Sequence, residues 1–499
     1  MPKKENRFFH ILPSVFSVLC CVVLVYILGL LVFGEGTLEQ YYANLSPVSS
    51  MALFPLALAG IAGLLWLRSR TCAGQMGVWK LRALFAGVLA VQLIIARSCW
   101  YKMGWDISVV YTTAEELARG VELSNPTYFA LCPNNAPLTI LQFIPMWLAV
   151  KIGLAVPFVV LPYIDAVLLN LSAYFAVRCT QAITESKVSY FFALVVSIGW
   201  IALSPYIFYP YTDVFSILFP VLALYVYLRV KHPVFKWFLV SLLCFFGASI
   251  KPTVLIFMIA LVILGVCRFL AMRDVSWKNA LCIVAAVIIG MLPGKIWQDQ
   301  TTAYLAGSAT PEGQLSETHY LMLGMNGDTF GGHSPDDVTF SQSFETLAER
   351  RSANLARAWE RLTERSLFEN VKFFSVKAYK AYADGSFASH SSFLELEVPK
   401  RTDRFSTFLR SLYHKRGSLM PVCQAIAQWL WLMILTLCAM ACIRSRSHPA
   451  AALLALTLLG ATAYLLLFEV WPRYLFLYAP FFVILASLAL DKPLILQKK

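Results

Sequence analysis

The sequence predicts an all-α protein that crosses a membrane many times, and three observations lead to this prediction. Of its 499 residues, 59% are hydrophobic and only 14% are charged, whereas soluble domains carry about 25% charged residues. The apolar residues form runs long enough to cross a bilayer as helices. Lys and Arg gather in alternate linkers between these runs, which is how membrane proteins are oriented. The net charge of +13 therefore requires no nucleic-acid partner.

The apolar runs predict one integral membrane domain, 1–499, with a bundle of about 12–13 transmembrane helices. The first run follows Lys3, Lys4 and Arg7 and is too long for the core of a cleaved signal peptide, so we expect it to be a retained span. The expected spans are 11–33, 50–67, 83–98, 155–177, 188–208, 212–228, 236–250, 252–267, 279–296, 420–443, 450–468 and 474–490.

The basic linkers predict the orientation of the chain. The linkers 35–49 and 206–211 contain no Lys or Arg, so the opposite side is expected to be cytoplasmic, with both termini on it. The cations on that side are Lys3, Lys4, Arg7, Arg68, Arg70, Lys80, Arg82, Arg178, Lys187, Arg229, Lys231, Lys236, Arg268, Arg273, Lys278, Arg444, Arg446, Lys492, Lys498 and Lys499. We expect a multi-pass protein of a bacterial plasma membrane.

The run 136–151 is short for a span of about 20 residues. If it crossed the membrane, every later basic linker would lie outside, so we expect a re-entrant or surface helix. A thirteenth helix paired with a miscounted span is the alternative.

Two long segments are expected to be external loops, 99–135 and 297–419. In the first, Ile107, Val110, Tyr111, Ala114 and Leu117 recur at helical spacing, which predicts a short amphipathic helix on the bilayer surface. Asp106 stands at the start of this helix, where it can serve as an N-cap, as a fixed functional carboxylate, or as both.

In the second loop, residues 342–382 are expected to form an amphipathic helix. Its apolar positions alternate with arginines, a pattern typical of helices on anionic membrane surfaces. The turn-rich segment 327–337 includes His333, Asp336 and Asp337, which could bind a metal but more often form a solvated turn.

The twelve cysteines lie mostly inside apolar runs, where Cys acts as a small hydrophobic residue. A disulfide between Cys99 and Cys132, which flank the Asp106 segment, is left open. The sequence has no zinc-type spacing of Cys and His.

Ionisable residues gather at the expected external ends of the spans, where such groups are costly and therefore informative. Asp213, Lys251, Glu469 and Arg473 are the principal examples. The two cations are either anchors that snorkel to the interface or a phosphate site, which we favour because the other short external turns contain no cation.

Several short motifs resemble the GT-C glycosyltransferases that use polyprenyl-phosphate sugars. They are Gly104-Trp105-Asp106, Pro133-Asn134-Asn135, Tyr211-Thr212-Asp213, Ser249-Ile250-Lys251-Pro252 and Trp471-Pro472-Arg473-Tyr474. The Pro-Asn-Asn piece, and the segment from His319 to Asn326 with Gly331-Gly332, resemble uncharacterised Gram-positive members of this superfamily. The chain departs from the protein O-mannosyltransferases, because its first loop does not begin with an Asp-Glu pair. It also departs in that no soluble domain is expected after the last span.

The resemblance implies a transferase that moves a sugar from a polyprenyl-phosphate donor to an acceptor outside the membrane. Asp106 would be the general base, and Lys251 and Arg473 would bind the donor phosphate. Further substrate-binding candidates are Glu115, Glu116, Asn134, Asn135, Asp213, His319 and Tyr474. No cofactor is expected, and a divalent metal is not favoured. The expected partners are the lipid donor, membrane lipids and a glycan, glycolipid or protein acceptor.

Two alternatives stay open. A lipid or small-solute transporter or flippase would explain the helix break at Lys251-Pro252, but it predicts internal repeats, which we do not find in the sequence. An O-antigen-ligase-like transferase would share the donor type but differ in fold.

Overall fold

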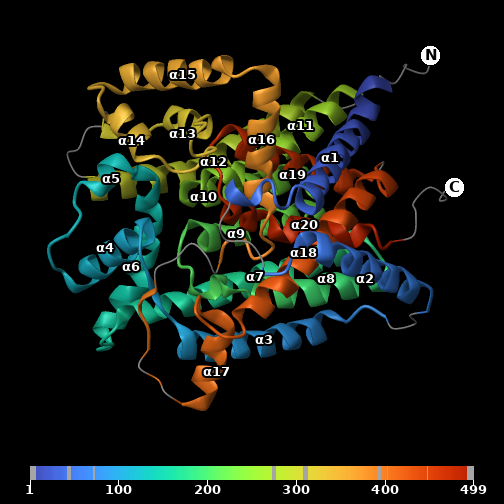
Figure 1. Cartoon of the computed structure of the whole chain (residues 1–499), viewed down its shortest axis with the longest axis horizontal. Coiled ribbons are helices and arrows are strands. Elements are labelled where there is room, and N and C mark those ends of the chain that lie inside the picture. Colours follow the sequence, from blue (N-terminus) through green and yellow to red (C-terminus); the bar gives the residue numbers. More distant parts are fainter. Residues whose placement is uncertain are drawn as a thin grey trace.

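A computed structural model describes residues 7–41, 47–70, 74–271, 277–306, 313–389, 395–399, 401, 403–446 and 448–491. It confirms the all-α class, since the described residues contain only two very short strands (Figure 1). The predicted cytoplasmic cations Lys3, Lys4, Arg273, Lys492, Lys498 and Lys499 lie outside the described residues.

Among the described residues, 11 helical segments are long and apolar enough to cross a membrane, and Pro472–Leu488 forms a shorter apolar helix. These segments match the twelve expected spans. Their helices are α1 (Arg7–Phe33), α2 (Ser50–Arg70), α3 (Val78–Cys99), α7 (Val160–Ile183), α8 (Lys187–Val196), α9 (Thr212–Arg229), α10 (Pro233–Ile250), α11 (Leu255–Ala271), α12 (Trp277–Ala306), α18 (Met420–Arg444), α19 (Pro449–Leu467) and α20 (Ala479–Leu488).

Proline sets the start of several of these helices. Pro233, Pro421 and Pro449 stand in the first turn of α10, α18 and α19, where a missing N–H costs nothing and the fixed φ suits a helix. Short 3-10 turns that begin with proline lead into other spans. They are Pro157–Val159 before α7, Pro205–Phe208 before α9, Pro252–Val254 before α11, and Pro472–Tyr478 before α20.

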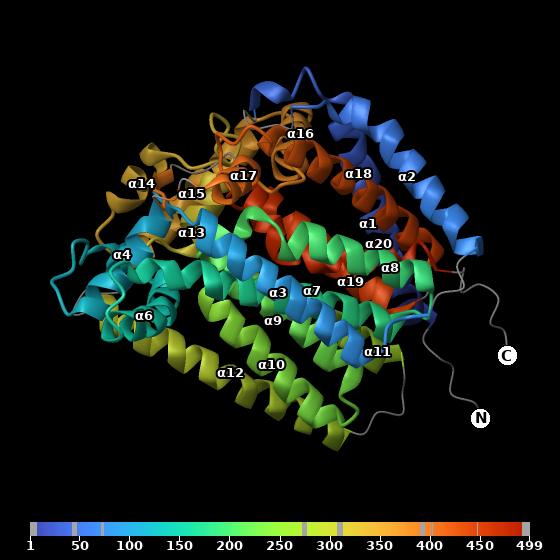
Figure 2. The same cartoon turned by 90° about the horizontal axis from the view of Figure 1, so that it is seen from below.

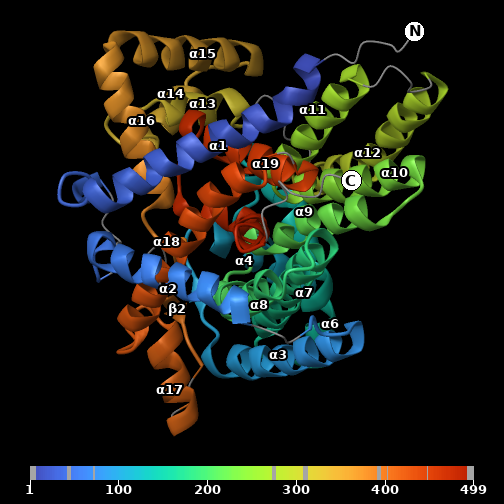
Figure 3. The ribbon, with the colours of Figure 1, turned by 90° about the vertical axis from the view of Figure 1, so that its right-hand side faces the viewer.

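The helix α20 forms the centre of the bundle. All of its residues are buried, and it packs against α7, α8, α18 and α19. Figure 3 views the bundle along this central helix, with α1 and α19 on one side and α3, α7 and α8 on the other. A helix that is apolar on all sides is stable only in such a position or in lipid.

The remaining helices gather at one end of the bundle, which we call the loop face (Figure 2). They are α4 (Asp106–Arg119), α5 (Tyr128–Leu131), α6 (Ala136–Lys151), α13 (Glu317–Gly324), α14 (Pro335–Gln342), α15 (Leu347–Glu364), α16 (Leu367–Tyr382) and α17 (Arg404–Tyr413). The strands β1 (Lys102–Met103) and β2 (Glu395–Glu397) pair antiparallel and join the two long segments.

The opposite end of the bundle holds the basic linkers. Arg68 in the last turn of α2 and Arg444 at the end of α18 both donate to the carbonyl of Asp491, the last described residue. Near the start of α1, Ser14 donates to the Arg446 carbonyl. The first and last described segments therefore share one end of the bundle, and the assignment of this end to the cytoplasm stays a prediction.

The segment 136–151 forms α6, which packs along α4 and also contacts α7 and α12. With 16 residues it is shorter than the helices that qualify as spans. Its place relative to the lipid stays a prediction.

Residues 342–382 form two helices rather than the single one expected. The reason lies in two capping boxes, in which Thr346 pairs with Glu349 and Ser366 pairs with Glu369. Each box satisfies free N–H groups at a helix start, so the second box begins α16, and α15 ends at Glu364.

Candidate functional site

The loop face contains a cavity of about 190 Å³ that is lined by chemically reactive and aromatic side chains. They come from three segments that are far apart in the sequence: the turn before α4, the turn before α14, and the link between α19 and α20. The lining residues are Trp105, Asp106, Ile107, His333, Glu469, Trp471 and Arg473. Two of them, Asp106 and Arg473, are site residues predicted from the sequence.

The first segment presents an indole and a carboxylate to the solvent. Trp105 has a φ of 66°, a left-handed conformation that is costly for any residue except glycine and that clusters at functional sites. Its side chain is nevertheless 68% exposed, so packing of the ring does not account for the conformation. The Trp105 carbonyl accepts hydrogen bonds from the backbone N–H and the hydroxyl of Ser108, and these bonds hold the turn in place.

Asp106 follows as the first residue of α4, and its carboxylate is exposed. The expectation that it caps the helix is wrong, because the N-cap is Trp105 and no side-chain capping bond is present there. Among the described residues, none donates a hydrogen bond to the Asp106 carboxylate. Burial raises the pKa of Tyr128, and electrostatic interaction with Tyr211 and Asp106 raises it further.

The apolar face of α4 does not lie on the bilayer as expected. Ile107, Val110, Tyr111 and Ala114 are buried within the protein core, and α4 packs mainly against α6. An amphipathic pattern shows only that one face of a helix is covered. Here the covering partner is another helix of the same chain.

The link between α19 and α20 supplies the guanidinium and a second carboxylate. Arg473 donates to the Tyr209 hydroxyl, and its guanidinium lies over the rings of Tyr211 at 5.4 Å and Tyr474 at 5.2 Å. Glu469 accepts hydrogen bonds from the Trp471 indole at 3.3 Å and the Tyr474 hydroxyl at 2.9 Å. Stacked phenols and one hydroxyl acceptor fix the guanidinium and leave donors free for a ligand.

Two lysines of α16 hold the segment that carries His333. Lys377 is buried, and its Nζ donates to the carbonyls of Gly324 at 2.6 Å and Phe468 at 2.8 Å. Lys380 donates to the Thr329 carbonyl at 2.7 Å. Gly331 has a φ of 72°, and a Cβ there would stand 2.7 Å from the Lys377 Nζ, so a side chain at this position would be strained and would displace the ammonium. The two lysines thus tie the end of α13 and the turn before α14 to the end of α19.

The burial of these lysines predicts that stability rises with pH. Burial lowers the pKa of Lys377 to about 7 and that of Lys380 to about 8, below the value of about 10.4 for an exposed lysine. Between these values the unfolded chain binds more protons than the folded one, so the free energy of unfolding increases as the pH rises.

We expect the melting temperature in detergent to increase between pH 7 and pH 9.5. Lys377→Met should flatten this increase, while Lys372→Met on the exposed side of the same helix should not. A wild-type melting temperature that falls over this range would contradict the prediction.

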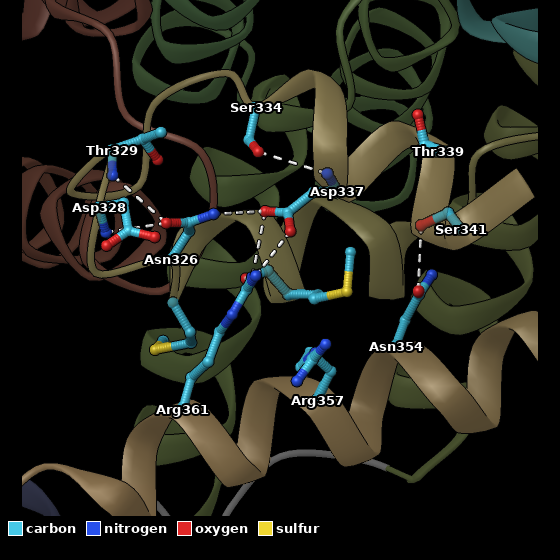
Figure 4. Close-up of polar contacts among 12 residues, drawn as sticks. Asn326, Asp328, Thr329, Ser334, Asp337, Thr339, Ser341, Asn354, Arg357 and Arg361 are labelled. Carbon is cyan, nitrogen blue, oxygen red and sulfur yellow. Dashed lines mark hydrogen bonds and ion pairs between the residues drawn. The ribbon is translucent and has the colours of Figure 1, made fainter.

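Asp337, which was considered as a metal ligand, lies in a polar network (Figure 4). The Asp337 carboxylate accepts from both terminal nitrogens of Arg361, at 2.6 and 3.1 Å, and from the Asn326 amide at 2.9 Å. Ser334 caps α14 by accepting from the Asp337 N–H. Asp337 is therefore engaged in a bidentate ion pair. Among the described residues, no group of three or more His, Cys, Asp or Glu side chains is arranged to hold a metal ion.

The arginines of α15 differ in their surroundings. Arg350 is buried and donates to the carbonyls of Ser341, Gln314 and Phe344, while Arg361 pairs with Asp337. These two arginines bond to other parts of the second loop. They therefore do not contribute to the cationic surface that was expected to face anionic lipid.

Lys251 and Asp213 form a buried ion pair behind the cavity, and neither residue lines it. Their side chains are 8% and 0% exposed, and the Lys251 ammonium lies 4.6 Å from the centre of the Tyr474 ring. Lys251 is therefore not a snorkelling anchor. Tyr474 separates the pair from Arg473 and is in contact with both cations.

The other predicted site residues lie outside the cavity wall. Glu115 pairs with Arg119 and lies 4.0 Å from Lys102, and Glu116 accepts from the Ser124 N–H. Asn134 donates weakly to Asn135, which accepts from the Tyr211 hydroxyl and donates to Tyr128.

His319 is buried, and its Nδ1 lies 2.7 Å from the Ser341 hydroxyl. This contact holds α13 against α14. Cys99 and Cys132 are both free thiols, so the disulfide that was left open is not present.

Four cavity residues were not among the predicted site residues, namely Trp105, His333, Glu469 and Trp471. Trp471 stands in the Trp471-Pro472-Arg473-Tyr474 motif, but the predicted roles there fell on Arg473 and Tyr474, and His333 lies in the segment 327–337, where a solvated turn was favoured. Trp105 gave one usable signal, since it stands between Gly104 and Asp106 in a motif that carries the family resemblance.

The cavity combines the groups that a sugar and a phosphate require. Indole faces stack on the apolar faces of sugar rings, a guanidinium binds phosphate oxygens in two places, and a carboxylate without a donor can accept a proton.

Comparison with curated proteins found no match, and comparison with solved structures found none either. One family model, described as conserved hypothetical integral membrane protein, matches residues 13–494. This match covers nearly the whole chain, and the protein therefore belongs to that family of integral membrane proteins.

Proposed function

We propose that the protein is a glycosyltransferase of the GT-C type, which transfers a sugar from a polyprenyl-phosphate donor to an acceptor at the loop face. The observation that carries the proposal is the meeting of Asp106 and Arg473 in one cavity, between the indoles of Trp105 and Trp471. We assign this face to the outside of the cell because the basic linkers lie at the opposite end.

In the proposed reaction, the sugar occupies the cavity with its C1 toward Asp106. The carboxylate removes the proton from the acceptor hydroxyl as the new C1–O bond forms. The bond between C1 and the phosphate oxygen breaks, and the lipid phosphate leaves with its electron pair. Arg473 stabilises the negative charge that grows on the phosphate, and the membrane holds the lipid at the depth of the site.

Arg473 rather than Lys251 is the proposed phosphate ligand, because only Arg473 lines the cavity. Lys251 neutralises Asp213 and contributes its field from behind Tyr474. The proposed reaction uses no metal, because the Arg473 guanidinium can stabilise the negative charge on the leaving phosphate as a divalent ion does in other transferases.

The test uses protein reconstituted in liposomes with a panel of polyprenyl-phosphate donors labelled in the sugar. A transferase moves label from the lipid to an acceptor or to water and releases polyprenyl phosphate. Arg473→Ala should raise the donor concentration needed for half-maximal rate about tenfold or more, the effect of one charged hydrogen bond. Arg473→Lys should recover only part of this loss, because an ammonium cannot bind two phosphate oxygens in the same geometry.

The transporter alternative predicts a different outcome. Labelled lipid would then cross the bilayer with its sugar–phosphate bond intact. The helix break at Lys251-Pro252, with its buried ion pair, is the feature that a transporter would also explain. Unchanged donor dependence in both Arg473 variants, together with uncleaved donor in the opposite leaflet, would refute the transferase proposal.

A further inference from the structure

A second cavity, of about 210 Å³, lies between the π-helical turn Ser197–Ala202, α17 and α18. We call it the apolar cavity, because its walls are mainly aromatic and aliphatic and none of the described residues that line it is charged. Its lining residues on α18, from Cys423 to Leu430, belong to the first three turns of that span. The apolar cavity therefore lies at the depth of the leaflet on the loop face.

One wall of the apolar cavity is a tightly bonded turn, 384–389. The Asp384 carboxylate accepts from the backbone N–H groups of Ser386 and Ala388, both at 2.8 Å. Phe387 and Ala388 both have positive φ values, 54° and 62°, a conformation that persists only where the surroundings enforce it. The turn also contacts α18 closely, since a Cβ on Gly385 would stand 2.5 Å from the Ala427 carbonyl.

The opposite wall is fixed to the same turn. The Trp200 indole donates to the Gly385 carbonyl at 2.8 Å, and the Tyr206 hydroxyl donates to the Phe387 carbonyl at 2.7 Å. The π-helical turn Ser197–Ala202 widens the backbone at this point, as π-bulges often do at functional sites. With both walls bonded to each other, the apolar cavity cannot close by a small movement of side chains, so it is available for a ligand.

Two residues indicate what the ligand is. Ile426 lines the apolar cavity and is 52% exposed on α18, so the cavity continues to the surface of a membrane span, where hydrocarbon chains are the solvent. Ser389 also lines the cavity and is 4% exposed, and its hydroxyl has no hydrogen-bond partner among the described residues. A buried hydroxyl without a partner is costly, and an ester carbonyl of a ligand would satisfy it.

We propose that the apolar cavity binds one acyl chain of a phospholipid from the leaflet on the loop face. The chain enters past Ile426, and its ester carbonyl accepts a hydrogen bond from Ser389. A polyprenyl chain has no carbonyl group, so the hydroxyl favours the ester-linked lipid. The stacked rings of Tyr206 and Phe476, with centres 3.7 Å apart, line the apolar cavity, whereas Arg473 does not. The inference does not depend on the transferase proposal.

The test is photolabelling of the full-length protein in nanodiscs with phosphatidylglycerol that carries a diazirine on one acyl chain. We expect adducts on peptides from the lining segments, 199–206, 385–389 and 412–430. Ile426→Trp, which closes the entrance, should lose most of this label. Val422→Trp is the matched control, because Val422 lies one turn away on the same helix, is 54% exposed and does not line the apolar cavity.

Ser389→Ala should lower the labelling yield about two- to tenfold at limiting probe, the effect of one hydrogen bond. Unchanged labelling in both Ile426→Trp and Ser389→Ala would overturn the proposal. It would also be overturned if unlabelled polyprenyl phosphate, added at equal concentration, removed the label more effectively than unlabelled phosphatidylglycerol, since the site would then belong to the isoprenoid.

Discussion

Purified Asp106→Asn protein should transfer sugar about 10²-fold or more slowly than the wild type, the lower range of a general-base contribution. The amide has the shape of the carboxylate but cannot take the proton of the acceptor hydroxyl. Because Asp106 is exposed and makes no capping bond, its replacement should leave folding unchanged. Initial rates at saturating donor, with melting curves of both proteins, measure the two effects separately.

Glu116→Gln is the control for this prediction. Glu116 lies on the same helix, but its carboxylate accepts from the Ser124 N–H and does not line the cavity, so the variant should keep the wild-type rate. Glu469 is the main rival base, since it does line the cavity. A wild-type rate in Asp106→Asn, with a rate below detection in Glu469→Gln, would transfer the base assignment to Glu469.

The spans were predictable because their signal is local. Each consists of a long apolar run, and the hydrocarbon thickness sets its minimum length. The run 474–490 shows the limit of this signal, because Pro472–Leu488 is shorter than the other spans and begins with a 3-10 turn. This helix is surrounded by protein in the centre of the bundle, so its length need not match the thickness of the hydrocarbon layer.

The packing partner of an amphipathic helix was not predictable. The pattern from Ile107 to Leu117 correctly indicates a covered face, but sequence periodicity does not distinguish lipid from a neighbouring helix. For residues 342–382, the periodicity likewise indicated helix but not the number of helices. There, a capping box at Ser366 and Glu369 was visible in the sequence and would have divided the segment into two helices.

For the site, the free-energy cost of placing a charged residue near the membrane was the useful guide. Charged residues at the ends of spans are expensive, and this argument selected Asp213, Lys251 and Arg473, which the structure brings together around Tyr474. It failed for Trp105 and His333, which carry no such cost. Their place in the cavity depends on contacts between remote segments, such as the bonds from Lys377 to Gly324 and Phe468.

The ion pair between Lys251 and Asp213 should give the largest change in stability. Lys251→Met leaves a buried carboxylate without a counter-charge, and Asp213→Asn leaves a buried ammonium without one. Each single variant should lose about 3–5 kcal/mol of unfolding free energy. The double variant should recover most of this loss, because replacing a whole buried pair by neutral groups is often close to neutral. Denaturation of the four proteins in mixed micelles gives the double-mutant cycle.

The same double variant separates a structural role of Lys251 from a role in donor binding. If Lys251 acts only through Asp213, the stable double variant should bind the donor with nearly wild-type affinity, while Arg473→Ala should not. If Lys251 contacts the phosphate directly, as the sequence suggested, donor affinity should stay low although stability has returned. Additive losses in the double variant would show that the two side chains are not coupled in the folded protein, in conflict with the buried contact between them.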